Sequence, residues 1–359
     1  MEKSGRIRID LDREELVYSG RIDKRDAKRP EFIFPASSVH FRFRGRKAVL
    51  TVENRSIYWN NYAGAIVDGE QRKWPLKKKG KTEILLVEEE AEGEHEILFF
   101  KRQDSCHEMV LCSLELSEGG KLLDAPLTPE RKIEVYGDSV SAGEVSEAVE
   151  YTGKADPEHS GEYSNSWYSY AWMTARKLHA QIHDIAQGGI ALMDGTGWFH
   201  EPEAVGMESV WDKVHYAPEL GEALPWDFRK YTPDAVIVAI GQNDSHPEDY
   251  MKEDMEGERA SLWREKYKEF LKMLRMKYPA VPIVCCTTLL YHDISWDTSI
   301  ERACRDLADD RVRHFVFGRN GKGTPGHLRI EEAQEMAEEL AAYLEEWVYG
   351  GNKNGKAEE

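Results

Sequence analysis

The hydrophobic and polar positions of the chain follow one period up to about residue 116 and a different period after about residue 130. In the first part, apolar and polar side chains alternate one by one, as in residues 39–44, Val-His-Phe-Arg-Phe-Arg. This is the period of a half-buried β-strand. Turn-forming pairs such as Asp68-Gly69 and Glu92-Gly93 separate the runs. Many short strands at near-regular spacing predict an N-terminal antiparallel β-sandwich of the jelly-roll type.

The second part of the chain alternates candidate strands with candidate helices. The strands are apolar runs at residues 133–136, 182–186, 235–240, 283–289 and 314–317. The last helix begins near Ile330 and carries apolar residues at helical intervals. This alternation predicts an α/β three-layer domain in which helices cover both faces of a parallel sheet.

Glycines and prolines between residues 117 and 129 mark the linker between the two parts. We therefore predict three segments from the pattern. They are a β-sandwich domain over residues 1–125, an α/β domain over residues 126–350, and a polar tail over residues 351–359.

Composition and charge exclude several classes of partner. The chain has 359 residues and a formal net charge of −18, which argues against binding to nucleic acid or to an anionic membrane. It contains no apolar run of about 18 residues. Its first ten residues lack the apolar core of a signal peptide, so we expect a cytoplasmic protein. Five cysteines, with Cys285 and Cys286 adjacent, fit reduced core thiols better than a disulfide framework.

Three motifs next to the predicted strands and the last helix point to nucleophilic catalysis. In chain order they are Gly137-Asp138-Ser139, Gly241-Gln242-Asn243-Asp244 and Gly326-His327. A serine hydroxyl needs a base to remove its proton, and the tetrahedral intermediate needs hydrogen-bond donors for its oxyanion. We predict Ser139 as the nucleophile and His327 as the base, because imidazole exchanges protons near neutral pH.

The expected oxyanion hole consists of the backbone N–H of Ser139, the backbone N–H of Gly189 and the side-chain amide of Asn243. Gly189 ends the sequence Ala-Gln-Gly-Gly at residues 186–189, which follows a predicted strand. A glycine there lets the backbone approach a substrate closely. Two structural alternatives stay open, since Gly189 fits an ordinary turn and Asn243 fits a helix cap.

In this order the motifs resemble those of the SGNH (GDSL-like) hydrolases. Together with the β-rich first domain, residues 5–350 resemble carbohydrate esterase family 2. The resemblance implies a serine esterase of the acetyl xylan esterase type, which removes acetyl groups from xylo-oligosaccharides or similar small acetylated carbohydrates. It also implies an acyl-enzyme intermediate and no cofactor.

One departure from the family pattern concerns the acid of the catalytic triad. Many SGNH enzymes carry an aspartate three residues before the histidine, whereas this chain has Thr324. A Ser-His dyad, with His327 oriented by a backbone carbonyl, is therefore the leading hypothesis. The alternative is a distant carboxylate, for which Asp293 and Asp297 are the candidates.

Metal binding is not expected, and two aromatic residues are candidates for contact with the substrate. His179 and His183 lead into a strand, so they lack helical ligand spacing, and the chain has no Cys-x-x-Cys pair. Sugar rings stack on aromatic faces, which favours Trp198 and Trp296, both placed in predicted loops near the catalytic motifs.

Two other functions remain as alternatives to the sugar esterase. One is an SGNH lysophospholipase or thioesterase that cleaves longer acyl chains, and the other is a non-catalytic glycan-binding protein. The segment 194–211 fits either a wall of the pocket or a contact between copies of the chain, so a homo-oligomer stays possible.

Overall fold

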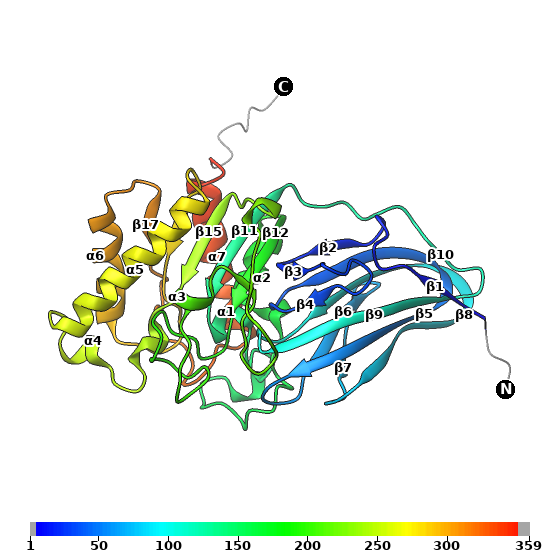
Figure 1. The fold of residues 1–359 in the computed structure, drawn as a ribbon, viewed down its shortest axis with the longest axis horizontal. Coiled ribbons are helices and arrows are strands. Elements are labelled where there is room, and N and C mark those ends of the chain that lie inside the picture. The colour runs from blue at the N-terminus through cyan, green and yellow to red at the C-terminus, as the bar shows by residue number, and fades with distance from the viewer. Residues whose placement is uncertain (1–4, 351–359) are drawn as a thin grey trace.

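The structure is a computed structural model that describes residues 5–350, so the predicted polar tail at 351–359 lies outside the described residues. Two domains lie side by side in Figure 1, an all-β domain in blue to cyan and an α/β domain in green to red. Within residues 5–350, no helix combines the length and the apolar composition that a membrane crossing requires.

From residue 5 onward, where the structure describes the chain, the N-terminal domain is built from ten strands. They are β1 (Arg6–Ile9), β2 (Val17–Ser19), β3 (Ile22–Asp23), β4 (Glu31–Phe32), β5 (Ser38–Ser56), β6 (Tyr62–Val67), β7 (Glu70–Pro75), β8 (Lys81–Lys101), β9 (His107–Ser117) and β10 (Lys121–Leu122). All neighbouring strands are antiparallel, and the main path runs β3-β4-β9-β5-β8-β6-β7. The predicted antiparallel β domain is confirmed.

Hydrogen bonds join these strands into one curled sheet (Figure 1). The long strand β5 pairs with β8 along one edge, while its other edge pairs first with β2 and β10 and then with β9. The register between β5 and β8 shifts between Gly45 and Lys47, and such bulges bend a strand and increase its twist. The curled sheet encloses an apolar core that includes Phe41, Leu50 and Phe99.

One predicted turn of this domain is confirmed and another is wrong. Asp68 and Gly69 have positive φ angles of 51° and 86° and join β6 to β7 as a two-residue hairpin. Glu92-Gly93 forms no turn, because β8 continues through it and Gly93 pairs with Gly45 of β5. The two shorter strands predicted on either side of Glu92-Gly93 are therefore one strand.

In the described part of the chain, the α/β domain contains seven further strands, seven helices and four short 3-10 helices. The strands are β11 (Arg131–Gly137), β12 (Ala180–Ala186), β13 (Lys213–His215), β14 (Leu224–Pro225), β15 (Ala235–Ala239), β16 (Ile283–Cys285) and β17 (Val312–His314). The helices are α1 (Ser139–Ala142), α2 (Tyr170–Lys177), α3 (Met207–Val210), α4 (Tyr250–Glu253), α5 (Glu258–Lys277), α6 (Ile294–Leu307) and α7 (Ile330–Trp347). The 3-10 helices are η1 (Val149–Tyr151), η2 (Ser166–Tyr168), η3 (Phe228–Lys230) and η4 (Gln242–Ser245).

Five of these strands form the predicted parallel sheet, and the structure gives their order as β12-β11-β15-β16-β17. Successive residues of β15 point to opposite faces. Val236 and Val238 belong to the apolar cluster that contains α5 and α6, whereas Ile237 belongs to the cluster that contains α2 and α7. Both faces of the sheet are therefore buried, which explains why the central strands β15 and β16 read as continuous apolar runs.

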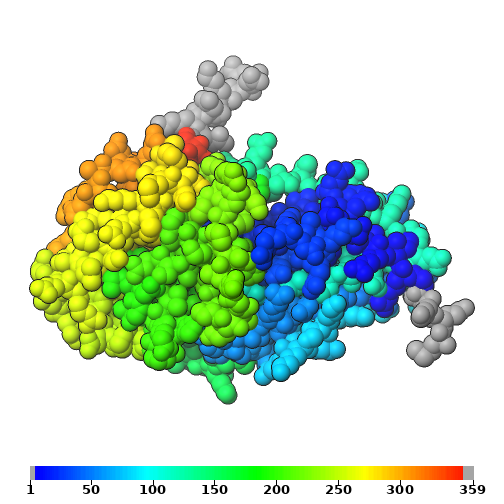
Figure 2. Space-filling model, viewed as in Figure 1, coloured from blue at the N-terminus to red at the C-terminus, as the bar shows by residue number. Residues whose placement is uncertain are grey.

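A buried arginine anchors the β domain to the α/β domain. The guanidinium of Arg21 donates to the carbonyls of Trp211 (2.7 Å) and Lys213 (3.0 Å), and to Tyr136 Oη (3.0 Å). It also lies 3.4 Å from the carboxylate of Glu134, and neither side chain is exposed to solvent. Figure 2 shows the blue segments of the first domain directly against the green segments of the second.

Candidate active site

The predicted catalytic residues lie at one edge of the parallel sheet. Ser139 begins α1 directly after β11, Gly189 follows the end of β12, and Asn243 lies in η4 after β15. Because the carboxyl ends of parallel strands meet at the same edge, the turns that follow them converge. Together with His327, which precedes α7, these three residues line one cavity of about 670 Å³.

Asp138 holds the turn that carries Ser139. Its Oδ1 accepts the N–H of Val140 (3.0 Å) and caps α1. Its Oδ2 accepts from Gln242 Nε2 (2.7 Å) and from Asn243 Nδ2 (3.2 Å), which joins two of the sequence motifs. Burial raises the pKa of Asp138 to about 6. Asp138 is thus a structural link between the two turns.

A carboxylate that the sequence did not reveal orients His327. Asp156 Oδ2 lies 2.7 Å from His327 Nδ1, and Asp156 Oδ1 accepts the backbone N–H of His327 (3.0 Å). Arg329 Nη1 lies 3.0 Å from Asp156 Oδ1. Burial opposes the charge on Asp156, but the hydrogen bond from His327 and these other contacts outweigh it and lower the pKa to about 2.

The expectation of a Ser-His dyad, with His327 oriented by a backbone carbonyl, is therefore wrong, because the carboxylate of Asp156 contacts the imidazole. Both alternative acids are engaged elsewhere: Asp293 caps α6 through the N–H of Ser295 (3.0 Å), and Asp297 accepts from His292 (2.9 Å). Asp156 escaped prediction because it lies in irregular chain and in no recognisable motif.

The backbone around Gly189 leaves one N–H free at the cavity. Gly189 has a φ of +71°, and its carbonyl accepts the N–H of Trp198 (2.8 Å). Among the described residues, the Gly189 N–H donates no hydrogen bond. A Cβ at this position would lie 2.8 Å from the Cβ of Trp198. Both this close approach and the positive φ require glycine here. The Asn243 amide donates to the carbonyl of Ile190 (3.0 Å) as well as to Asp138.

A second histidine and a glutamate stand next to His327. Glu144 Oε2 lies 3.4 Å from His159 Nε2 and 3.7 Å from His327 Nε2, and all three residues line the cavity. Burial opposes protonation of His327, but Asp156 and Glu144 outweigh it and raise the pKa of its imidazole above the ordinary value. Glu144 follows the nucleophile by five residues, which is the only signal in the sequence that could have drawn attention to it.

The β domain supplies part of the cavity wall. Tyr58, Trp59 and Asp104 line the cavity together with residues of the α/β domain. The ring of Trp59 lies 4.2 Å from that of His159, centroid to centroid. The active-site cavity is therefore built between the two domains, and its shape depends on how they pack.

The two aromatic candidates have different positions. Trp198 lines the cavity with 56% of its surface exposed and stacks on His246 at 3.3 Å. Trp296 is fully buried, donates its Nε1–H to Asp249 (3.0 Å), and packs edge to face on Trp263. The prediction that Trp296 contacts substrate is wrong, because the residue lies on the inward face of α6 rather than in a loop.

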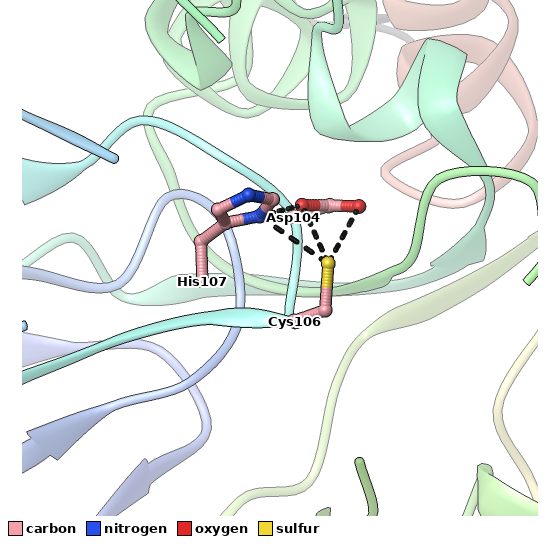
Figure 3. Close-up of side chains that lie close together, drawn as sticks. All are labelled: Asp104, Cys106 and His107. Atoms are coloured by element: carbon pink, nitrogen blue, oxygen red, sulfur yellow. Dashed lines mark hydrogen bonds and ion pairs between the residues drawn. The ribbon is translucent and has the colours of Figure 1, made fainter. Parts of the chain in front are cut away.

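Two groups of three potential metal ligands occur in the described part of the chain, Asp104-Cys106-His107 and Asp23-Glu31-His215. In the first, His107 Nδ1 lies 2.6 Å from Asp104 Oδ1, and the Cys106 thiol lies 3.4 Å from the same oxygen (Figure 3). Hydrogen bonds among these three side chains account for their closeness. Neither group includes His179 or His183, the two histidines considered in the sequence.

Comparison with known proteins agrees with this arrangement. Residues 18–126 match the family model described as carbohydrate esterase 2 N-terminal. The chain is 30% identical over 348 residues to a cellulase/esterase of Acetivibrio thermocellus, and 28% identical over 232 residues to an acetylxylan esterase / glucomannan deacetylase of Cellvibrio japonicus. These alignments cover 93% and 65% of this chain, but only 40% and 62% of the two relatives.

A solved structure extends the match over both domains. It is a family two carbohydrate esterase from Clostridium thermocellum in complex with cellohexaose, with a TM-score of 0.76 and 29% identity. The superposition covers 92% of this chain and 98% of that one. With a first domain that matches the carbohydrate esterase 2 N-terminal model and the same two-domain architecture over nearly its whole length, the chain is similar to this family two carbohydrate esterase.

Proposed function

We propose that the protein is a serine esterase that removes acetyl groups from acetylated carbohydrates. The observation that carries this proposal is the convergence of Ser139, Gly189, Asn243 and His327 on one cavity, with His327 oriented by Asp156. A nucleophile, a base held by a carboxylate, and oxyanion donors together form the constellation required for acyl transfer.

In the first half of the reaction, His327 Nε2 removes the proton of Ser139 Oγ as that oxygen attacks the acetyl carbonyl. The negative charge that develops on the carbonyl oxygen is held by the N–H groups of Ser139 and Gly189. The Asn243 amide joins them when one of its two N–H groups, which donate to Asp138 and to the Ile190 carbonyl without substrate, turns to the oxyanion. Ser139 is the first residue of α1, so helix geometry leaves its N–H without an intrahelical acceptor. His327 then protonates the departing sugar oxygen, which leaves an acetyl group on Ser139.

In the second half, His327 removes a proton from water, and the resulting nucleophile attacks the acetyl-enzyme. Collapse of the second tetrahedral intermediate releases acetate and returns the proton to Ser139. Asp156 keeps the proton of His327 on Nδ1, so that Nε2 faces the reaction as an acceptor. Asp156 and Glu144 both stabilise the imidazolium that forms at each proton transfer.

The substrate that the cavity favours is a small, uncharged acetylated sugar, such as an acetylated xylo-oligosaccharide. Asp104, Glu144 and Glu201 line the cavity, and this negative charge disfavours anionic ligands. Tyr58, Trp59 and Trp198 provide aromatic surface for a sugar ring. The acetylxylan esterase activity named for the Cellvibrio relative supports this choice.

Acetate release from acetylated xylo-oligosaccharides tests the proposal. We expect release by the wild type and near-background release by Ser139→Ala. Ser141→Ala is the matched control, since this serine lies on the same helix and pairs with Tyr170 Oη at 2.8 Å, and it should keep its activity.

Equal activity of the wild type and Ser139→Ala would contradict the assigned nucleophile. If neither released acetate from sugars, nitrophenyl esters of increasing acyl length would decide between the alternatives. Activity on long esters would favour a lipase-like or thioesterase function, and inactivity on all esters combined with sugar affinity would favour a binding protein.

A further inference from the structure

Asp104 is a buried carboxylate of the β domain that reaches into the active site of the other domain. It lies between β8 and β9, only 3% of its surface is exposed, and it lines the same cavity as Ser139 and His327. Asp104 takes part in none of the acyl-transfer steps proposed above. Its buried charge beside the cavity therefore needs another explanation.

Asp104 Oδ2 binds the segment that leads to Gly189. It accepts the backbone N–H of Gly188 (2.9 Å) and the side-chain amide of Gln187 (2.6 Å). The hydroxyl of the next residue of the β domain, Ser105, lies 3.0 Å from Gln187 Oε1 and 3.1 Å from the carbonyl of Ala186, and these two acceptors share its one proton. One turn of the β domain therefore holds three consecutive residues in front of the proposed oxyanion donor.

The opposite carboxylate oxygen fixes Asp104 itself. Asp104 Oδ1 lies 2.6 Å from His107 Nδ1 and 3.4 Å from the Cys106 thiol (Figure 3). Lys101 donates its ammonium group to the backbone carbonyls of Gln103 and Asp104. Burial opposes ionisation, but His107, Lys101 and the Gly188 N–H outweigh it and hold the pKa of Asp104 well below its ordinary range. Asp104 is thus ionised, and both of its carboxylate oxygens accept hydrogen bonds.

The space around Gly188 shows how closely the segment is held. A Cβ at Gly188 would lie 1.9 Å from Glu144 Oε1 and 2.8 Å from Asp104 Oδ2, so two carboxylates occupy the space that a side chain would need. Gly189 follows with its positive φ and its free N–H at the cavity. Because an oxyanion donor must be preorganised to be effective, a small displacement of this segment weakens it.

We propose that Asp104 is a positioning residue, through which the β domain holds the Gln187-Gly188 segment so that the Gly189 N–H points at the oxyanion. This inference rests on the proposed function, and it gives the β domain a part in catalysis besides forming a wall of the cleft.

Kinetics of Asp104→Ala and Asp104→Asn on an acetyl ester test the proposal. The alanine variant loses the acceptor, and we expect kcat to fall about 10- to 100-fold while KM stays within about threefold, because the lost interaction acts in the transition state. Asparagine keeps an oxygen that accepts both bonds, so Asp104→Asn should retain most of the wild-type kcat. Asp23→Asn is the matched control, since Asp23 also accepts across the domain boundary, from His215 at 3.0 Å, but does not touch the segment.

Should Asp104→Ala fail to fold, Gln187→Met provides the test, because it leaves Asp104 ionised and removes one of its two bonds to the segment. We expect a loss of about 3- to 10-fold in kcat for this variant. Wild-type kcat in a folded Asp104→Ala or Gln187→Met enzyme would overturn the proposal. A loss in Asp104→Asn as large as in Asp104→Ala would also overturn it, because charge rather than hydrogen-bond acceptance would then be the cause.

Amide hydrogen exchange gives a readout that needs no substrate. The Gly188 N–H donates to a buried carboxylate, so a peptide covering residues 184–192 should exchange slowly in the wild type and at least about tenfold faster in the variant that lacks the acceptor. Unchanged exchange would overturn this inference alone. A wild type that releases no acetate would instead contradict the proposed function.

Discussion

Asp156 Oδ2 lies 2.7 Å from Nδ1 of His327, although the two residues are 171 positions apart in the chain. This contact gives the candidate base a carboxylate partner that comes from the irregular chain after α1 rather than from the segment that carries the histidine. The sequence position usually filled by an aspartate holds Thr324, whose side chain accepts the N–H of Gly153 near the same loop. Asp156 therefore supplies a carboxylate from another part of the chain, while Thr324 occupies the usual aspartate position and makes a structural hydrogen bond.

Asp156→Asn should lower kcat by about 10²- to 10⁴-fold, because the amide cannot enforce the Nδ1–H tautomer or stabilise the imidazolium. Initial rates of acetate release measure the effect. Asp293→Asn is the control, since that aspartate caps α6 and asparagine caps a helix equally well. A large loss in the control with none in Asp156→Asn would restore the alternative acid.

Glu144→Gln should move the acidic limb of the pH–rate profile to lower pH. The base form of His327 is required, so activity rises as pH passes upward through its pKa, which the neighbouring carboxylates raise. Removal of the Glu144 charge lowers that pKa, and the base form then persists at lower pH. Glu158→Gln, an exposed change in the segment next to His159, should leave the profile in place.

Trp198→Ala should affect substrate binding, whereas Trp296→Ala should affect stability. The first removes aromatic surface from the cavity, so KM for an oligosaccharide should rise while thermal stability stays near that of the wild type. The second empties a fully buried site and should cost about 3–5 kcal/mol of unfolding free energy. Calorimetry and kinetics on both variants separate the two roles, and a stable Trp296→Ala enzyme with a raised KM would reverse our assignment.

Arg21→Met should destabilise the protein by about 3–5 kcal/mol, because it leaves the buried carboxylate of Glu134 without its cation. Adding Glu134→Gln should recover part of the loss, since the unpaired charge is then absent. Denaturant unfolding of the single and double variants measures both effects. Arg229→Met, which breaks an exposed pair with Asp227, should leave the stability unchanged.

His215 should make the stability of the domain contact depend on pH. Its ring lies 2.9 Å from Glu108 and 3.0 Å from Asp23, and although burial opposes protonation, these carboxylates raise the pKa of the imidazole. A raised folded pKa stabilises the fold below the ordinary value near 6.5, and this stabilisation is lost as pH rises through the folded pKa. His215→Gln should therefore lower Tm at pH 5.5 more than at pH 9, and an equal loss at both would exclude the linkage.

Much of the fold and of the site could be predicted from local sequence. The switch from alternating to helical spacing separated the two domains, because strand and helix periods are fixed by backbone geometry. Ser139, Gly189 and Asn243 were identifiable since each follows the end of a parallel strand, and those ends meet at one edge of the sheet. The Glu92-Gly93 turn was mispredicted because Gly93 pairs with Gly45, a partner from a distant part of the chain.

The sequence by itself determined the order of elements and indicated the candidate nucleophile, the candidate base and the candidate oxyanion donors, since these depend on spacing along the chain. Only the tertiary structure decided that Asp156 orients His327, that Glu144 stands beside it, that Asp104 reaches in from the other domain, and that Trp296 is core. The physical reason is that irregular segments obey no periodic rule, so the contacts they make follow from packing between distant parts of the chain.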